Sequence, residues 1–425
     1  MTVLDDMLRL GKQAKEASRR LALVSAADKN VALLAMADAL EAASTELKEA
    51  NALDLGVGRQ LGLSSAMLDR LELNDTRIAG MAAGLREVAA LPDPVGRILD
   101  RRTRPNGLRI EKISSPIGVV VIIYESRPNV TADAASLCLK SGNACILRGG
   151  KEALNSNRLI ARLMVEAAVK QVPGFPVDAI QVVPTADREA IPALLSLTQY
   201  VDLCMPRGGE GLIRAVTECS KVPVIKHYKG VCHVFVDRDA DLEMAGRIVL
   251  NAKCQRPSTC NAMETLLVDR SIAGRFLASI VPQLQVHGVA VRADDESLRL
   301  LGQGSGLQLR AATEADYSTE YNDFVMNLKV VAGVEEAVIH ISTHGSAHSD
   351  SIVTRNEATA RQFMASVDSA AVYWNASTRF TDGGEFGMGA EIGISTDKIG
   401  ARGPMGLEEL TTYKWLVFGN GQIRS

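Results

Sequence analysis

The chain has 425 residues, more than one ordinary hydrophobic core organises, so we expect two or three domains. Its composition, 47% hydrophobic and 23% charged, is typical of a soluble globular protein, and no apolar run approaches the length of a membrane span. A formal net charge of -3 gives no reason to expect nucleic acid or an acidic membrane as a partner. The seven cysteines lack CxxC spacing, which argues against a disulfide framework or zinc site and favours a cytoplasmic location.

The first part of the chain, residues 1 to about 90, carries apolar residues at helical spacing and predicts several antiparallel helices. After it, Asn106-Gly107 lies between two short alternating runs, 96–99 and 108–111, which predicts a β-hairpin. The apolar run 413–418 predicts a last strand that could pair with this hairpin. We expect the hairpin to serve an interface.

From Gly118 onward, strands and helices alternate, which predicts a parallel sheet with ligands at the carboxyl ends of its strands. The predicted strands of this region are 119–123, 144–148, 180–183, 201–205 and 222–225. The predicted helices are 130–139, 154–169 and 191–197.

A second α/β region begins near Cys232. Its predicted strands are 232–236, 265–268, 289–292, 328–331, 340–342, 351–354 and 371–375. A predicted helix, 239–252, leads directly to the polar loop that contains Cys260.

Cys260 is the strongest candidate for a nucleophile. It ends a short polar turn, and the nearby positive charges of Lys253 and Arg256 favour the thiolate, which is the reactive form. The alternative is that Cys260 only packs, because cysteine is among the most buried residue types.

Two glycine turns follow neighbouring predicted strands. Gly149-Gly150-Lys151 and Arg207-Gly208-Gly209 would let backbone approach a ligand closely, and Lys151 would favour an anion. Neither turn is a GxGxxG fingerprint or a Walker A loop. Each could be only a tight turn, but two of them suit a dinucleotide, which needs contacts at its ribose and at its pyrophosphate. Together with a cysteine nucleophile, they favour thiol addition to a carbonyl followed by hydride exchange with a nicotinamide.

The histidines do not indicate a metal site. His340, His344 and His348 are four residues apart, but the strand character of 340–342 favours a loop over a helix that would align them. We therefore expect no metal.

Five motifs carry a family resemblance that covers most of the chain. They are Tyr124–Thr131, Gln255–Ala262, Glu320–Phe324, Phe386–Ser395 and Ala401–Trp415. With them the chain resembles the aldehyde dehydrogenase superfamily, and within it the branch that reduces γ-glutamyl phosphate in proline biosynthesis.

The resemblance implies an α/β fold with two parallel-sheet domains and a small β oligomerisation element. The expected NADP-binding domain is Rossmann-like and comprises residues 1–95 and 117–229. The expected catalytic domain, 230–405, holds Cys260. The oligomerisation element comprises 96–116 and 406–425.

The resemblance also assigns cofactor-binding residues. Glu320 falls on the glutamate that holds the nicotinamide ribose, and Arg207, Gly208 and Gly209 fall on the pyrophosphate turn. Arg148 and Lys151 fall at the adenine ribose, where general aldehyde dehydrogenases have a lysine and a glutamate. A lysine in place of that glutamate would attract a 2′-phosphate, which favours NADP(H).

The implied reaction is NADPH-dependent reduction of L-glutamyl 5-phosphate to L-glutamate 5-semialdehyde and phosphate, through a Cys260 thioester. His227 stands in place of the superfamily's general-base glutamate, which fits a reductase that does not hydrolyse its thioester; we give His227 no catalytic role. Candidate substrate residues are Ser126, Arg127, Arg256 and Asn375.

Two other readings stay open, namely another NAD(P)-dependent aldehyde dehydrogenase and a non-catalytic binding protein on the same fold. The resemblance further implies a homo-oligomer and a transient contact with glutamate 5-kinase.

Overall fold

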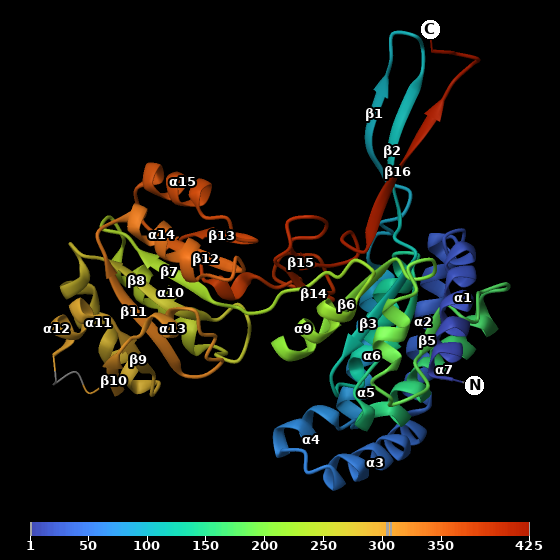
Figure 1. Cartoon of the computed structure of the whole chain (residues 1–425), viewed down its shortest axis with the longest axis horizontal. Coiled ribbons are helices and arrows are strands. Elements are labelled where there is room, and N and C mark those ends of the chain that lie inside the picture. Colours follow the sequence, from blue (N-terminus) through green and yellow to red (C-terminus); the bar gives the residue numbers. More distant parts are fainter. Residues whose placement is uncertain (1, 303–305, 307, 425) are drawn as a thin grey trace. The chain divides into compact units, whose positions relative to one another are not determined.

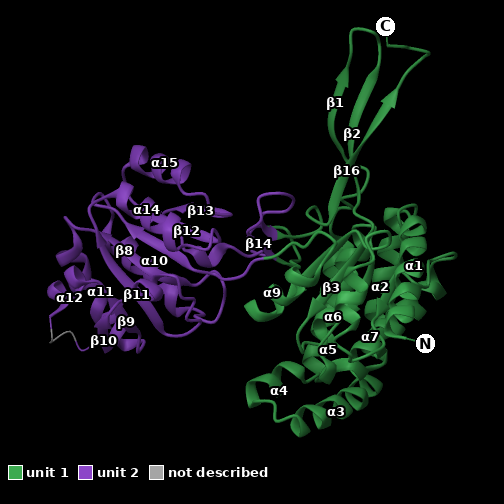
Figure 2. Cartoon of the chain, in the orientation of Figure 1, with its two compact units in different colours: residues 1–226, 387–393, 405–425 green, residues 227–386, 394–404 purple. Residues whose placement is uncertain are grey.

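The computed structural model describes residues 2–302, 306 and 308–424 (Figure 1). The chain forms two compact units, each built from separate segments (Figure 2). Unit 1 comprises residues 1–226, 387–393 and 405–425, and unit 2 comprises 227–386 and 394–404. The first boundary falls three residues before the expected one, and 387–393 join unit 1 instead of the expected catalytic domain. No helix in the described ranges is long and apolar enough to cross a membrane.

Helices make up the first part of unit 1, as predicted. They are α1 (Val3–Leu21), α2 (Ala26–Ala42), α3 (Ser44–Gln60), α4 (Ser65–Leu71) and α5 (Asp75–Ala90). Polar caps begin four of them, because the side chains of Thr2, Ser25, Ser64 and Asn74 each accept a first-turn backbone N–H. The apolar face of α1 packs into one core with the strands of the adjacent sheet.

The sheet of unit 1 is parallel, with strand order β5-β4-β3-β6. Its strands are β3 (Val119–Tyr124), β4 (Ala144–Arg148), β5 (Ile180–Val182) and β6 (Leu203–Arg207). Its helices are α6 (Asn129–Lys140), α7 (Leu154–Gln171), α8 (Ala190–Leu195) and α9 (Glu210–Cys219), with a 3-10 turn, η1 (Lys151–Ala153). Because the strands are parallel, the residues after β3, β4 and β6 lie at one edge of the sheet.

The predicted strand 222–225 is wrong. Only a single parallel bridge joins Val224 to Cys204 of β6. Pro223 has no N–H to continue a ladder, and its carbonyl accepts from the backbone N–H of Cys204 at 2.9 Å before the pairing stops.

The predicted hairpin and the last strand form one antiparallel sheet in unit 1. It comprises β1 (Ile98–Thr103), β2 (Arg109–Pro116) and β16 (Thr411–Phe418), in the order β1-β2-β16. Several large side chains of β16 are exposed, including Tyr413, Trp415 and Phe418. The Lys112 ammonium lies 3.6 Å from the centroid of the Tyr413 ring, so cations cover part of this aromatic surface.

Unit 2 is a second parallel sheet, with strand order β10-β9-β11-β8-β7-β12-β13. Its strands are β7 (Cys232–Val236), β8 (Met263–Asp269), β9 (Ala290–Ala293), β10 (Gln308–Ala311), β11 (Val325–Val331), β12 (Ser349–Val353) and β13 (Ala371–Trp374). Its helices are α10 (Leu242–Cys254), α11 (Ala273–Val286), α12 (Asp295–Leu301), α13 (Glu314–Tyr317), α14 (Val334–His344) and α15 (Glu357–Ser366), with a 3-10 turn, η2 (Thr378–Phe380). Two short strands, β14 (Gly393–Ser395) and β15 (Gly403–Met405), pair separately.

Both faces of the unit 2 sheet are covered. Leu266 and Val268 of β8 pack in a core with α10 and α11, whereas Leu267 between them packs with α14 and α15 on the other face. This alternation follows from the two-residue period of a strand. It explains why these strands read as continuous apolar runs.

The predicted strand 340–342 is wrong, because it lies within helix α14. The β-branched Ile339, Ile341 and Thr343 suggest a strand by alternation. The residues of α14 that enter the core, however, are Val334, Ala337 and Ile341, which follow the helical period.

Candidate active site

Cys260 lies in the turn between α10 and β8, at the amino end of β8. It is partly buried. A Cβ on Gly230, just before β7, would lie 1.8 Å from the carbonyl oxygen of Cys260. Only glycine therefore lets the segment before β7 pack against the backbone of Cys260.

The backbone around Cys260 is held from two sides. The Cys232 thiol of β7 lies 3.3 Å from the Cys260 carbonyl oxygen and donates to it. The hydroxyl of Thr378 on η2 donates to the Asn261 carbonyl at 2.7 Å, and the Asn261 amide donates to the carbonyl of Thr381 at 2.9 Å. A fixed loop of this kind keeps a nucleophile in one position.

Lys253, which the sequence analysis placed near the thiol as a positive charge, is committed elsewhere. Its side chain is fully buried, and its Nζ lies 2.9 Å from Oε2 of the equally buried Glu264. Burial raises the pKa of the Glu264 carboxyl to about 7, and the Lys253 ammonium opposes that rise. The other oxygen of Glu264, Oε1, accepts the backbone N–H of Asn322 at 3.3 Å.

Glu320 lies in the loop between α13 and β11, two residues before Asn322. Asn322 has a φ of 55°, so this loop turns sharply before β11. Strands β11 and β8 are neighbours in parallel register, with Asn327 opposite Thr265. The structure therefore brings the Glu320 and Cys260 loops together at the amino ends of adjacent strands.

Asn375 does not join this group. It follows β13, at the carboxyl end of the parallel sheet, whereas Cys260 precedes β8 at the amino end. Its side chain accepts from the Thr354 N–H at 2.9 Å and donates to the Thr354 carbonyl at 3.0 Å. The Asn375 side chain therefore joins the ends of β12 and β13, away from the Cys260 loop, and its assignment to the substrate stays a prediction.

Arg379 of η2 is a residue that the sequence analysis missed. Its Nε donates to Gln255 Oε1 at 2.8 Å and its Nη1 donates to Asn261 Oδ1, so it joins both ends of the Cys260 loop. In the chain, 118 positions separate it from Asn261. No local spacing links residues so far apart, and only the packing of η2 on the loop brings them together.

A cavity of about 280 Å³ lies at the carboxyl edge of the unit 1 sheet. It collects Arg148 and the Gly149-Gly150 turn with Ser126 and Arg127, although the sequence analysis assigned the last two to the substrate. Its lining residues are Met67, Arg70, Tyr124, Glu125, Ser126, Arg127, Arg148, Gly150, Glu152 and Leu212. Lys151 is exposed on η1 and does not line it.

Glycine keeps this cavity open. A Cβ on Gly150 would lie 2.5 Å from Glu152 Oε1 and 2.6 Å from Ser126 Oγ. Arg148 is partly buried, and that burial lowers the pKa of its guanidinium, while the Glu152 carboxylate opposes the change. A partly desolvated arginine beside a glycine turn suits an anionic ligand.

The predicted pyrophosphate turn begins α9. The backbone N–H of Gly209 donates to Glu125 Oε1 at 2.9 Å, and a Cβ on Gly208 would lie 2.7 Å from the same oxygen. The Arg207 guanidinium lies against Gly393, where a Cβ would be 2.3 Å from Nη1. Gly208 and Gly209 thus lie beside Glu125 of the cavity wall, whereas the Arg207 side chain packs against Gly393.

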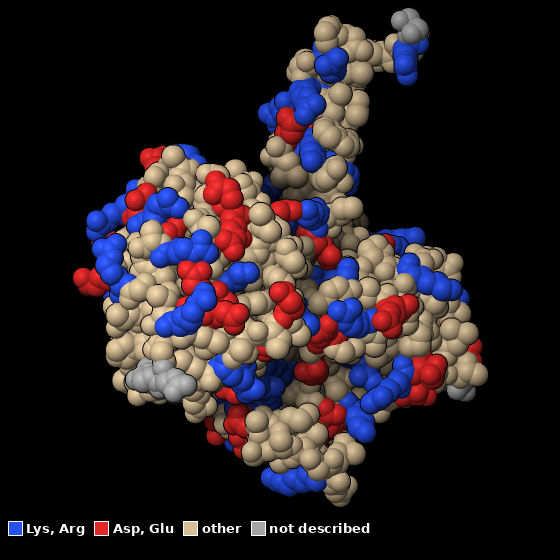
Figure 3. All heavy atoms as spheres, turned by 60° about the vertical axis from the view of Figure 1, so that its left-hand side comes forward, with Lys and Arg blue, Asp and Glu red and all other residues tan. Residues whose placement is uncertain are grey.

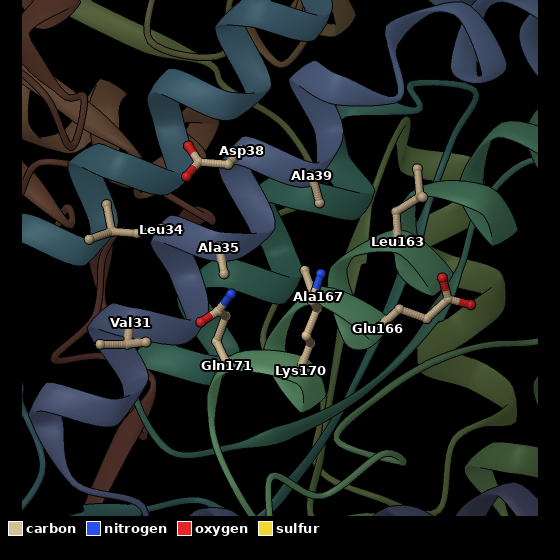
Figure 4. A pocket seen from close by; sticks show the side chains of 10 residues that line it. All are labelled: Val31, Leu34, Ala35, Asp38, Ala39, Leu163, Glu166, Ala167, Lys170 and Gln171. Atoms are coloured by element: carbon tan, nitrogen blue, oxygen red, sulfur yellow. The ribbon is translucent and has the colours of Figure 1, made fainter.

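Another cavity of unit 1, of about 560 Å³, contains none of the predicted site residues. It lies between α2 and α7, and Figure 4 shows its mostly aliphatic lining, with Asp38, Glu166, Lys170 and Gln171 among it. Asp38 pairs with Arg86 at 2.7 Å.

The histidines of unit 2 contact one another and the backbone. His340 and His344 do align on α14, with ring centroids 4.7 Å apart, whereas His348 immediately precedes β12. In the part of the chain that the structure describes, no group of His, Cys, Asp and Glu side chains is placed to hold a metal ion. His227 Nδ1 lies 2.8 Å from the carbonyl oxygen of Ile394.

Comparisons with known proteins agree on one family. The model of the aldehyde dehydrogenase family matches residues 4–297. The chain is 54% identical over 424 residues to gamma-glutamyl phosphate reductase of Moorella thermoacetica, covering 100% of both chains. It is 53% identical to gamma-glutamyl phosphate reductase of Syntrophomonas wolfei, covering 99% of each. The crystal structure of gamma-glutamyl phosphate reductase from Thermotoga maritima superposes with a TM-score of 0.95, at 44% identity, covering 99% of this chain and 100% of that one.

The resemblance drawn from the five motifs and the expected α/β fold with two parallel sheets are thus confirmed. The chain belongs to the aldehyde dehydrogenase family, and within it to the gamma-glutamyl phosphate reductases.

Proposed function

We propose that the chain catalyses the NADPH-dependent reduction of L-glutamyl 5-phosphate to L-glutamate 5-semialdehyde and phosphate, a step of proline biosynthesis. The observation that carries the proposal is Cys260, held at the amino end of β8 in a chain that is 54% identical over 424 residues to a gamma-glutamyl phosphate reductase. All seven cysteines are thiols, which supports a cytoplasmic setting.

The chain's own part in the reaction is nucleophilic. The Cys260 thiolate attacks the acyl carbon, forming a C–S bond while the C–O bond to phosphate breaks and phosphate leaves. NADPH, when bound, supplies the hydride that reduces the resulting thioester. Collapse of the resulting thiohemiacetal anion then breaks the C–S bond, releases the aldehyde and returns the Cys260 thiolate.

Hydrolysis of the thioester would need a base that activates water. The residue in the place of that base is His227, whose Nδ1 lies against a backbone carbonyl. This contact orients the ring, and a reductase gains from leaving water unactivated.

The test of the proposed reaction is the phosphate dependence of its reverse. With L-glutamate 5-semialdehyde, we expect the enzyme to reduce NADP⁺ only when phosphate is added, because phosphate must release the acyl group from Cys260. An aldehyde dehydrogenase that hydrolyses its thioester needs no phosphate, so full activity in phosphate-free buffer would favour that alternative. No nicotinamide binding at all would favour a non-catalytic protein.

The cavity of about 280 Å³ supports NADP over NAD. Arg70, Arg127 and Arg148 are among its lining residues, together with Met67 and Leu212. Arginine suits the 2′-phosphate by its fork of donors, and the apolar groups suit an adenine ring.

Arg148→Met is therefore expected to raise the KM for NADPH by about tenfold or more, because it removes a charge-assisted hydrogen bond. The KM for NADH should change far less. Steady-state rates with each cofactor measure both constants. Lys151→Glu is the matched comparison, because Lys151 lies just outside the lining. If neither substitution lowers the preference for NADPH over NADH, the cofactor proposal fails.

A homo-oligomer formed through the β1-β2-β16 sheet belongs to the same proposal. Its support is the row of exposed side chains on β16, which a second subunit would cover. Sedimentation velocity of the full chain tests it.

A transient contact with glutamate 5-kinase would limit loss of a labile acyl phosphate. Acidic and basic side chains are interspersed over the face in Figure 3, so it offers no single-sign patch to steer that partner.

A further inference from the structure

Arg256 and Arg379 place two positive charges beside Cys260 from different parts of unit 2. Arg256 lies in the Cys260 loop and Arg379 lies on η2. The Arg379 guanidinium is fixed through Nε and Nη1, which donate to Gln255 and Asn261. Its Nη2 donates to none of the described residues, so one arm of a rigid fork remains available.

The charges around Arg379 favour an anion beside it. Burial lowers the pKa of the Arg379 guanidinium, and the nearby Arg256 lowers it further. The Cys260 thiol and the Asp382 carboxyl oppose this change. Asp382, however, already accepts the backbone N–H of Gly384 at 2.9 Å. Two adjacent guanidinium groups repel each other unless an anion binds between them.

We propose that Arg379, with Arg256, binds the phosphoryl group of the substrate next to Cys260, and binds inorganic phosphate in the reverse reaction. This inference rests on the proposed function. The phosphoryl oxygen is bonded to the carbon that the thiolate attacks, so the phosphate must lie beside Cys260 during attack. The α-carboxylate is at the other end of the glutamyl chain. A phosphate also carries more charge than a carboxylate and accepts from a guanidinium fork.

This assignment adds Arg379 to the candidate substrate residues Ser126, Arg127, Arg256 and Asn375. Arg127 lines the cavity of unit 1 together with Arg148 and Gly150. Arg379 instead contacts the residue that directly follows Cys260. In this proposal, η2 supplies an arginine next to Cys260 that local sequence spacing does not reveal.

Protection of Cys260 from iodoacetamide by inorganic phosphate tests the site without any substrate. In the wild type, phosphate should slow alkylation of Cys260 in a saturable way, which gives a Kd for phosphate. Arg379→Met should raise this Kd by about tenfold or more, the effect of losing a charge-assisted hydrogen bond, and Arg379→Lys, which keeps the charge without the fork, by less. An unchanged Kd in Arg379→Met overturns the proposal.

Two further variants separate anion binding from damage to the loop. Arg256→Met removes the second charge, and the Arg256 side chain donates to no described residue, so the loop contacts of Arg379 stay intact. It should also raise the Kd for phosphate. Arg361→Met is the control for net charge, because Arg361 lies on α15 and pairs with Glu357. It should leave the Kd unchanged, and an equal effect in this control also overturns the proposal.

Reverse-reaction kinetics distinguish the two anions of the substrate. In Arg379→Met, the KM for phosphate should rise by about tenfold while the KM for the semialdehyde stays within about twofold. If only the KM for the semialdehyde rises, Arg379 and Arg256 bind the α-carboxylate, which contradicts the phosphoryl assignment. Absence of phosphate dependence in the wild type would instead contradict the proposed function, and the alkylation assay would still report on the anion site.

Discussion

Cys260→Ser is expected to lower NADPH-dependent reduction of L-glutamyl 5-phosphate by about a thousandfold or more, which corresponds to roughly 4 kcal/mol of transition-state stabilisation. A thiol is partly ionised near neutral pH, whereas a serine hydroxyl is not. A serine would also form an ester, which accepts hydride less readily than a thioester. Oxidation of NADPH, measured with freshly made acyl phosphate, gives the rate.

Cys254→Ala is the matched control for this substitution. Cys254 ends α10, six residues before Cys260, and packs against the core of α10, α11 and the sheet. Burial raises the pKa of the Cys254 thiol, so it is a poor nucleophile. We expect near-normal activity from Cys254→Ala. Substantial residual reduction by Cys260→Ser, or an equal loss in the control, would remove Cys260 from the mechanism.

The sequence predicted most strands because their signal is local. Runs such as 119–123 and 232–236 are buried on both faces, and the structure confirms both as strands. The two wrongly predicted strands, 222–225 and 340–342, arise where an alternating apolar pattern is overruled by a proline or by tertiary contacts. Pro223 stops a ladder that the flanking valines favour, and α14 is a helix because its contacts with the sheet follow the helical period.

The sequence predicted those parts of the candidate site whose residues are adjacent in the chain. Cys260 and its loop are one such stretch, and the Gly149-Gly150 turn is another. Arg379 was missed because η2 joins the loop only through tertiary packing. The sequence also does not show which edge of the sheet Asn375 occupies, and the structure places it at the edge opposite to Cys260. Parallel strands send residues before and after each strand to opposite edges.

The partner of a charged side chain also cannot be predicted from nearness in sequence. Lys253 is near Cys260 in the sequence, but the sequence does not show that its ammonium pairs with Glu264. The side chains of Lys253 and Glu264 are both fully buried, and they pair with each other. Lys253 precedes the Cys260 loop and Glu264 follows it, so the pair holds the two ends of the loop together. Through Asn322, Glu264 also holds the loop that carries Glu320.

Lys253→Met is therefore expected to destabilise unit 2 by about 3–5 kcal/mol, because it leaves the Glu264 carboxylate buried without its partner. Urea unfolding followed by Trp374 fluorescence in a Trp415→Phe background measures this, since Trp374 lies in unit 2 and Trp415 in unit 1. Lys253→Met/Glu264→Met removes both charges and should recover most of the loss. If the double variant is no more stable than the single one, lost packing explains the effect and the ion pair does not.

The destabilisation by Lys253→Met should also depend on pH. The pKa of Glu264 in the folded wild type, about 7, already exceeds its unfolded value, so protonation favours the folded state and this contribution is lost as pH rises through about 7. Removing Lys253 raises this pKa further, because the ammonium favours the charged form. The variant should therefore lose more stability than the wild type between about pH 6 and about pH 8.5. A difference in unfolding free energy that is constant over this range would show that Glu264 is not the group left unpaired.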